Sequence, residues 1–108
     1  MPFPTEVFGN VIVVHTPEEL GSELCGVLES FVPSLKRPNV ILDMDATEII
    51  DSRGLDALVN VQDKLRDSAG ELKIATTNFT NRKILEITRL DQQLEVFDSV
   101  VEAVKSFQ

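Results

Sequence analysis

Short β-type runs alternate along the chain with longer stretches whose apolar residues recur at helical spacing. Two runs, at 6–8 and 11–14, flank Gly9-Asn10, a pair that adopts the positive φ angles of a tight turn at low cost. They predict an N-terminal hairpin. The run at 39–44 is rich in consecutive apolar and β-branched residues, which indicates a central strand covered on at least one face. Two later runs predict further strands, the first with alternating polarity and hence one buried face: 71–76 and 94–97.

The first helix is expected to begin at Thr16, which can cap it, with Pro17 in its first turn and Glu19 three residues after the cap. Glu18 and Glu19 would then be solvated helix charges. Apolar residues follow at helical spacing and form one stripe: Leu20, Leu24, Val27, Leu28 and Phe31. Cys25 lies off the centre of this stripe, which is typical of a small packing residue.

Three more helices are expected downstream. The second follows the apolar pair Ile49-Ile50 and ends at Ala69-Gly70, whose glycine is favoured at a helix C-terminus. The third spans 80–88, and the fourth begins after a cap at Asp98 or Ser99.

This order of elements predicts an α/β fold. Strands joined through helices are normally parallel neighbours, whereas the N-terminal hairpin is antiparallel. We therefore expect a mixed, mostly parallel sheet of about four to five strands with about four helices. The 108 residues suit a single domain spanning 1–108, since they can bury roughly two-thirds of their unfolded surface.

Composition narrows the range of partners. The formal net charge of −8 disfavours binding to nucleic acid and to anionic membranes, which require positive patches, and it favours a basic protein partner. The chain starts without a basic segment followed by an apolar run, and it has no apolar run near the ~20 residues that cross a bilayer. A cytoplasmic location is expected.

The sequence lacks the residues that a metal site, an internal disulfide or a bound cofactor would require. Cys25 is the single cysteine, so it cannot form an internal disulfide or a zinc site of several cysteines. The single histidine, His15, follows an apolar run and is interpreted as a residue at a strand end. No cofactor is expected.

The segment Asp51-Ser52-Arg53-Gly54-Leu55 lies where the chain leaves an apolar pair and enters the second helix. Asp or Ser at such a position ordinarily caps the helix, which is worth about 1 kcal/mol. A phosphate on Ser52 would meet the oriented N–H groups of the helix start. A nucleophilic serine would instead need a base, and His15 has nothing in the sequence to support that role.

Several ordered segments resemble the STAS domain family, which includes the bacterial anti-sigma factor antagonists. The resemblance covers about residue 39 to the end, roughly two-thirds of the chain. It is carried by 40–44, 49–55, 70–75, 81–91 and 94–99.

The resemblance implies a phosphorylation switch. In such antagonists the serine after the aspartate is phosphorylated by an anti-sigma factor that is itself a serine kinase, and a phosphatase resets the switch. Carried over, Ser52 is the phosphorylation site, and only the unphosphorylated form binds the anti-sigma factor. The partner-binding residues implied are Asp51, Ser52, Arg53, Gly54 and Asp56.

Three positions differ from the usual family pattern. Arg53 and Asp56 stand where small residues are common, and 15–20 replaces a turn that usually precedes the first helix. Arg53 has three interpretations: it pairs with Asp51, it pairs with a phosphate, or it points into solvent.

Two other functions are compatible with fewer of the features. The same fold serves as a scaffold or accessory subunit of a stressosome-like or other regulatory complex. An enzyme or nucleotide-binding protein is disfavoured, because the sequence has neither a glycine-rich phosphate loop nor a convincing catalytic set.

Overall fold

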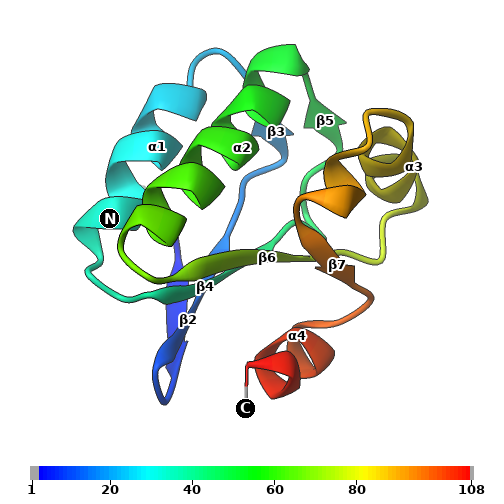
Figure 1. Ribbon diagram of the computed structural model, residues 1–108. Helices are drawn as coiled ribbons and strands as arrows, with labels where there is room; N and C mark the ends of the chain where they lie inside the picture. The colour runs from blue at the N-terminus through cyan, green and yellow to red at the C-terminus, as the bar shows by residue number, and fades with distance from the viewer. Residues whose placement is uncertain (1–2, 108) are drawn as a thin grey trace.

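The structure, a computed structural model, describes residues 3–107. Its main sheet has five strands in the order β1-β2-β4-β6-β7 (Figure 1). β1 is antiparallel to β2, and the remaining neighbours are parallel. The mixed, mostly parallel sheet is thus confirmed. Its strands are β1 (Thr5–Phe8), β2 (Val11–His15), β4 (Asn39–Asp43), β6 (Glu71–Ala75) and β7 (Glu95–Phe97).

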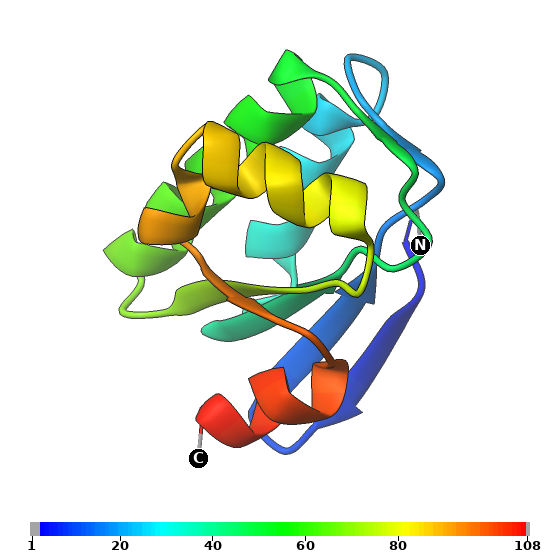
Figure 2. The ribbon, with the colours of Figure 1, turned by 90° about the vertical axis from the view of Figure 1, so that its right-hand side faces the viewer.

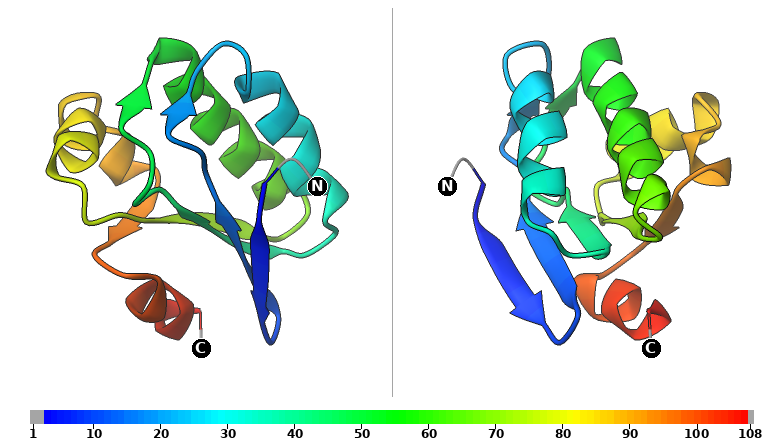
Figure 3. Two further views of the ribbon diagram at one scale, coloured as in Figure 1. Left: turned by 180° about the vertical axis from the view of Figure 1, so that it is seen from behind. Right: turned by 60° about the vertical axis from the view of Figure 1, so that its left-hand side comes forward.

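The predicted N-terminal hairpin is also confirmed. Gly9 in its turn has φ +64°, a left-handed conformation that costs glycine little. The hairpin places β1 at one edge of the sheet (Figure 3).

Helices cover both faces of the main sheet. Three lie on one face: α1 (Cys25–Ser34), α2 (Ser52–Asp67) and α3 (Phe79–Ile87). The short α4 (Val100–Ser106) lies on the opposite face (Figure 2). Four α-helices were predicted, and four are found in residues 3–107, together with the 3-10 helix η1 (Leu90–Gln92).

Each face has its own core. Ile12, Val14 and Leu42 pack under α1 and α2, whereas Val13 and Ile41 pack against Ala103 of α4. β6 was predicted to have one buried face, and this is wrong, because α4 also covers its other face. Lys73 on that second face is only 6% exposed.

The predicted start of the first helix is wrong. Residues Glu19–Leu20 form a strand, β3, that pairs in parallel with β5 (Ile49–Ile50), and α1 begins only at Cys25. Thr16 caps no helix, because its hydroxyl oxygen lies 2.6 Å from Thr47 Oγ1 and 3.2 Å from the Asp43 carbonyl oxygen instead. Figure 3 shows β3 and β5 side by side, set apart from the main sheet.

The end of α2 differs in detail from its prediction. Ala69, not Gly70, has the left-handed conformation, with φ +60°. The Gly70 N–H donates to the Leu65 carbonyl at 2.7 Å, which closes a Schellman motif. Gly70 is needed for a different reason: a Cβ there would lie 2.2 Å from the Pro38 carbonyl oxygen.

Candidate functional site

Asp51 joins β5 to α2 and caps the helix. Its Oδ1 accepts a hydrogen bond from the Gly54 N–H at 2.9 Å, and its carbonyl accepts from the Leu55 N–H at 3.1 Å. The cap therefore fixes the geometry of the first turn of α2. The sequence predicted this boundary correctly, because Asp51 follows an apolar pair and precedes residues at helical spacing.

Ser52 is the first residue of α2, and its side chain is exposed. Asp51, Arg53 and Asp56 are exposed as well, so four of the five predicted partner-binding residues share the surface of one helix start. Among residues 3–107 no ion pair of Arg53 is found, which leaves its guanidinium facing solvent.

Gly54, the fifth predicted partner-binding residue, is buried. A Cβ at this position would lie 2.4 Å from the Leu20 carbonyl oxygen and 2.9 Å from Ile50 Cγ1. Glycine thus lets α2 rest directly on β3 and β5. Gly54 can affect a partner only through the backbone position that it permits for Ser52.

A surface pocket of about 360 Å³ adjoins this corner. Four carboxylates line it, from Glu18, Glu19, Glu23 and Asp51. The interpretation of Glu18 and Glu19 as helix charges is wrong, because they lie in and just before β3. A strand of two residues carries no periodic signal, so the sequence alone could not place these side chains beside Asp51.

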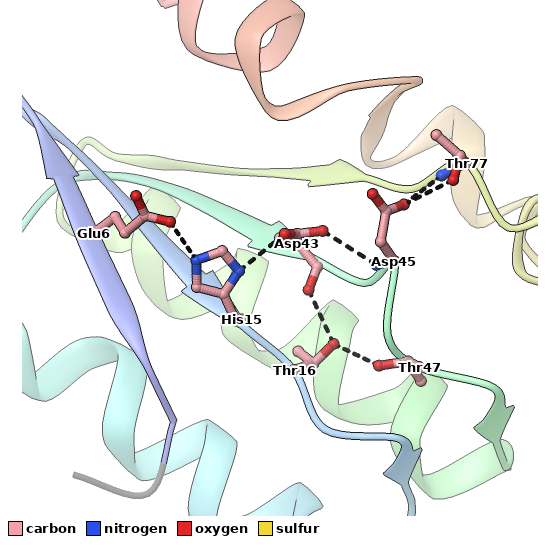
Figure 4. Close-up of polar contacts among 7 residues, drawn as sticks. All are labelled: Glu6, His15, Thr16, Asp43, Asp45, Thr47 and Thr77. Atoms are coloured by element: carbon pink, nitrogen blue, oxygen red, sulfur yellow. Dashed lines mark hydrogen bonds and ion pairs between the residues drawn. The ribbon is translucent and has the colours of Figure 1, made fainter.

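Polar side chains form a second cluster where the parallel strands end (Figure 4). His15 Nδ1 lies 2.9 Å from Asp43 Oδ2, and Nε2 lies 2.8 Å from Glu6 Oε1. Asp43 also accepts from the Asp45 N–H, and Asp45 accepts from the Thr77 N–H at 2.6 Å. Both ring nitrogens of His15 are engaged, so neither is free to act as a base for a serine. His15 ends β2, as its position in the sequence predicted.

Within residues 3–107, no group of three or more His, Cys, Asp or Glu side chains is arranged to hold a metal ion. Over the same residues, no helix has both the length and the apolar character to cross a membrane.

Comparisons with known proteins point to one family. Residues 4–103 match the model of the STAS domain. A Thermotoga maritima protein named as an anti-sigma factor antagonist is 24% identical over 107 residues, which cover 95% of each chain.

Solved structures share the fold. The structure of an anti-sigma factor antagonist from Mycobacterium paratuberculosis superposes with a TM-score of 0.85 at 21% identity, covering 96% of this chain and 91% of that one. SpoIIAA, described as an anti-sigma factor antagonist and Bacillus cell fate determinant, is also similar. Its unphosphorylated form has a TM-score of 0.72 at 16% identity, with coverage of 96% and 94%. Its phosphorylated form has a TM-score of 0.69 at 17% identity, with coverage of 98% and 99%.

The strand order of the sheet and the helix that starts at Ser52 are consistent with the family match, which covers nearly the whole chain. The chain belongs to the STAS domain family.

Proposed function

We propose that this chain is an anti-sigma factor antagonist that acts by partner switching in the cytoplasm. Its unphosphorylated form binds an anti-sigma factor that is also a serine kinase. Phosphorylation of Ser52 by that kinase blocks binding, and a phosphatase restores it. The protein itself is a binding module and not an enzyme. The names of its relatives support the class, and the exposed hydroxyl of Ser52 at the start of α2 is the observation that carries the site.

The surroundings of Ser52 suit an electrostatic switch. A phosphate adds roughly −1.5 to −2 charges at neutral pH. It would sit next to Asp51 and the acidic pocket, so it would add like charge to a surface that already carries four carboxylates. A phosphate enclosed in that interface without a cation would cost several kcal/mol, and each ~1.4 kcal/mol is tenfold in affinity.

The switch requires no large change in the backbone. The Asp51–Gly54 hydrogen bond and the tight contact of Gly54 with Leu20 already fix the first turn of α2. A phosphate on Ser52 can point outward from that turn, because the side chain is exposed. Phosphorylation therefore alters the charge and shape of the surface and leaves the fold in place.

The site is tested by labelling with radioactive ATP and a candidate anti-sigma factor kinase from the same organism. We expect phosphate on the wild-type chain and none on Ser52→Ala. Ser22→Ala is the matched control, because Ser22 is another exposed serine beside the same pocket, and it should be labelled like the wild type. Equal labelling of Ser52→Ala would show that the site is elsewhere.

Binding is tested with the same kinase by titration calorimetry. Ser52→Ala should bind within about threefold of the wild type, whereas Ser52→Asp should bind at least ~10-fold more weakly because of the added charge. Unchanged affinity of Ser52→Asp, together with large self-assembled particles in light scattering, would favour the scaffold function instead.

A further inference from the structure

The β3–β5 pair carries the Ser52 corner but cannot hold itself in place. Each of its strands has two residues, and even a longer isolated pair of strands is only marginally stable in water. The backbone bonds that flank the pair include Glu48 N–H to Glu18 O at 2.8 Å, Ile49 N–H to Glu18 O at 3.1 Å and Asp51 N–H to Leu20 O at 3.4 Å. Contacts with the rest of the molecule must therefore set its position.

Thr47, just before β5, provides one such contact. It is fully buried, and its Oγ1 lies 2.6 Å from both the Pro17 carbonyl oxygen and Thr16 Oγ1. Each hydroxyl has one hydrogen, so both short contacts are satisfied when Thr47 donates to Pro17 and Thr16 donates to Thr47. The longer contact of Thr16 Oγ1 with the Asp43 carbonyl oxygen, at 3.2 Å, is then left without a hydrogen. Figure 4 shows the contact between the two threonines, which joins the segments that lead into β3 and β5.

Asn81 of α3 provides a second contact. Its side chain is 1% exposed, and Nδ2 donates to the Thr47 carbonyl at 2.7 Å. A weaker bond at 3.4 Å reaches the Met44 carbonyl. α3 thereby contacts the connection between β4 and β5 at two backbone carbonyls.

Asn81 is expensive to bury. Its Oδ1 is buried and has no hydrogen-bond partner among residues 3–107. An unsatisfied buried acceptor is destabilising, and an apolar side chain of similar volume would not carry it. Buried polar groups that do not maximise stability can instead select one geometry over its alternatives.

Displacement of the pair would move Ser52 by two routes. β5 continues directly into Asp51, which caps α2. β3 supports the same turn from below, since the Leu20 carbonyl lies against Gly54 with no room for a Cβ. A shift of β3 or β5 would therefore shift Ser52, through the chain that joins β5 to Asp51 or through the tight contact between Leu20 and Gly54.

We propose that Thr47 and Asn81 are positioning residues that fix the β3–β5 pair, and with it the Ser52 corner, on the main sheet. The effect of this positioning on phosphorylation rests on the proposed function of Ser52. The positioning of the β3–β5 pair does not depend on that function. The two residues touch no partner, because both are buried. They act through the backbone of β3 and β5.

Amide hydrogen exchange tests the positioning directly. In Thr47→Val the hydroxyl is lost at nearly constant shape, and we expect the N–H groups of Ile49 and Asp51 to exchange at least ~10-fold faster. The N–H groups of Ile41 and Leu72 in the main sheet should exchange at the wild-type rate. Thr47→Ser keeps the hydroxyl and should return the rates to within about threefold of the wild type.

Asn81→Leu separates positioning from stability. We expect the same faster exchange at Ile49 and Asp51. The urea midpoint should change little, because the variant removes one unpaired buried acceptor, Asn81 Oδ1, and leaves another, the Thr47 carbonyl. Thr80→Val, an exposed position on the same helix, is the control and should change neither quantity.

Two results would overturn the proposal. One is unchanged exchange at Ile49 and Asp51 in both variants, and the other is acceleration that merely follows a loss of global stability.

The functional consequence is read from kinase labelling: Thr47→Val should lower kcat/KM for labelling of Ser52, and Thr47→Ser should restore it. Absence of label on the wild-type chain refutes the Ser52 function and leaves the exchange result standing. Normal labelling of Thr47→Val despite faster exchange refutes the functional link alone.

Discussion

The space around the glycine differs between the first turns of α1 and α2. Gly26 has open space around the position that a Cβ would occupy, with nothing within 4 Å. At Gly54 a Cβ would be 2.4 Å from the Leu20 carbonyl oxygen, and backbone atoms cannot move aside as a flexible side chain can. Residue type alone therefore does not decide the effect of a substitution.

Alanine substitution at the two positions should change stability in opposite directions. Gly54→Ala should lower the free energy of unfolding by about 1–3 kcal/mol through overpacking. Gly26→Ala should raise it by about 0.5 kcal/mol, since it restricts the unfolded chain and adds no clash. Urea denaturation followed by circular dichroism measures both. A Gly54→Ala variant as stable as Gly26→Ala would contradict the close contact between α2 and β3.

The short helix α4 contacts a buried lysine of the main sheet. Lys73 projects from β6 toward α4, and its Nζ donates to Ser106 Oγ at 2.8 Å. The same ammonium lies 4.2 Å from the centre of the Phe107 ring and 5.6 Å from that of Phe97. Glu95 Oε1 lies 3.7 Å away. A seven-residue helix has little stability of its own, so these contacts and the apolar contacts of Ala103 fix it to the sheet.

Truncation of this lysine should release α4. Lys73→Ala is expected to cost about 2–4 kcal/mol, because it removes a buried stem, the cation–π contacts and the bond to Ser106. Limited proteolysis should then cut the chain within 98–107 faster than in the wild type. Lys83→Ala is the matched control, since Lys83 also lies 5.6 Å from an aromatic ring centre, that of Phe79, but is exposed. It should cost less than about 0.5 kcal/mol. Equal effects of the two changes would argue against an anchoring role for Lys73.

At the scale of the whole molecule, two cores share one sheet. β4 contributes Leu42 to the core under α1 and α2, and Ile41 to the core under α4. Disruption of the sheet would therefore expose the apolar residues of both cores. The described chain also measures only 30 × 26 × 23 Å, so no part lies far from β4.

We therefore expect a single cooperative unfolding transition in urea. The chain has no Trp and no Tyr, so intrinsic fluorescence is of little use, and NMR resonances are the appropriate probes. The amide signals of Leu58 in α2 and Ala103 in α4 should disappear with the same midpoint. An earlier loss of Ala103 would mean that α4 unfolds separately from the rest.

Much of the fold and part of the site could be predicted from local sequence. The start of α2 at Ser52 was predicted because Asp51, the preceding apolar pair and the helical spacing that follows all indicate one boundary. The start of α1 was not, since Thr16 has the features of a cap but bonds to Thr47, which is 31 residues away. Local signals fail where a distant partner competes for the same hydroxyl.

The sequence by itself determined the order of the main strands and helices, the mostly parallel character of the sheet and the place of Ser52 at a helix start. These follow from periodicity and capping, which act within a few residues. Only the tertiary structure decided that Glu19–Leu20 is a strand, that Lys73 is buried and that Asn81 bonds to the Thr47 carbonyl before β5. Each of these depends on a partner at least 20 residues away in the sequence. The physical reason is that a strand of two residues and a buried polar side chain are stable only once the complete fold supplies their hydrogen-bond partners.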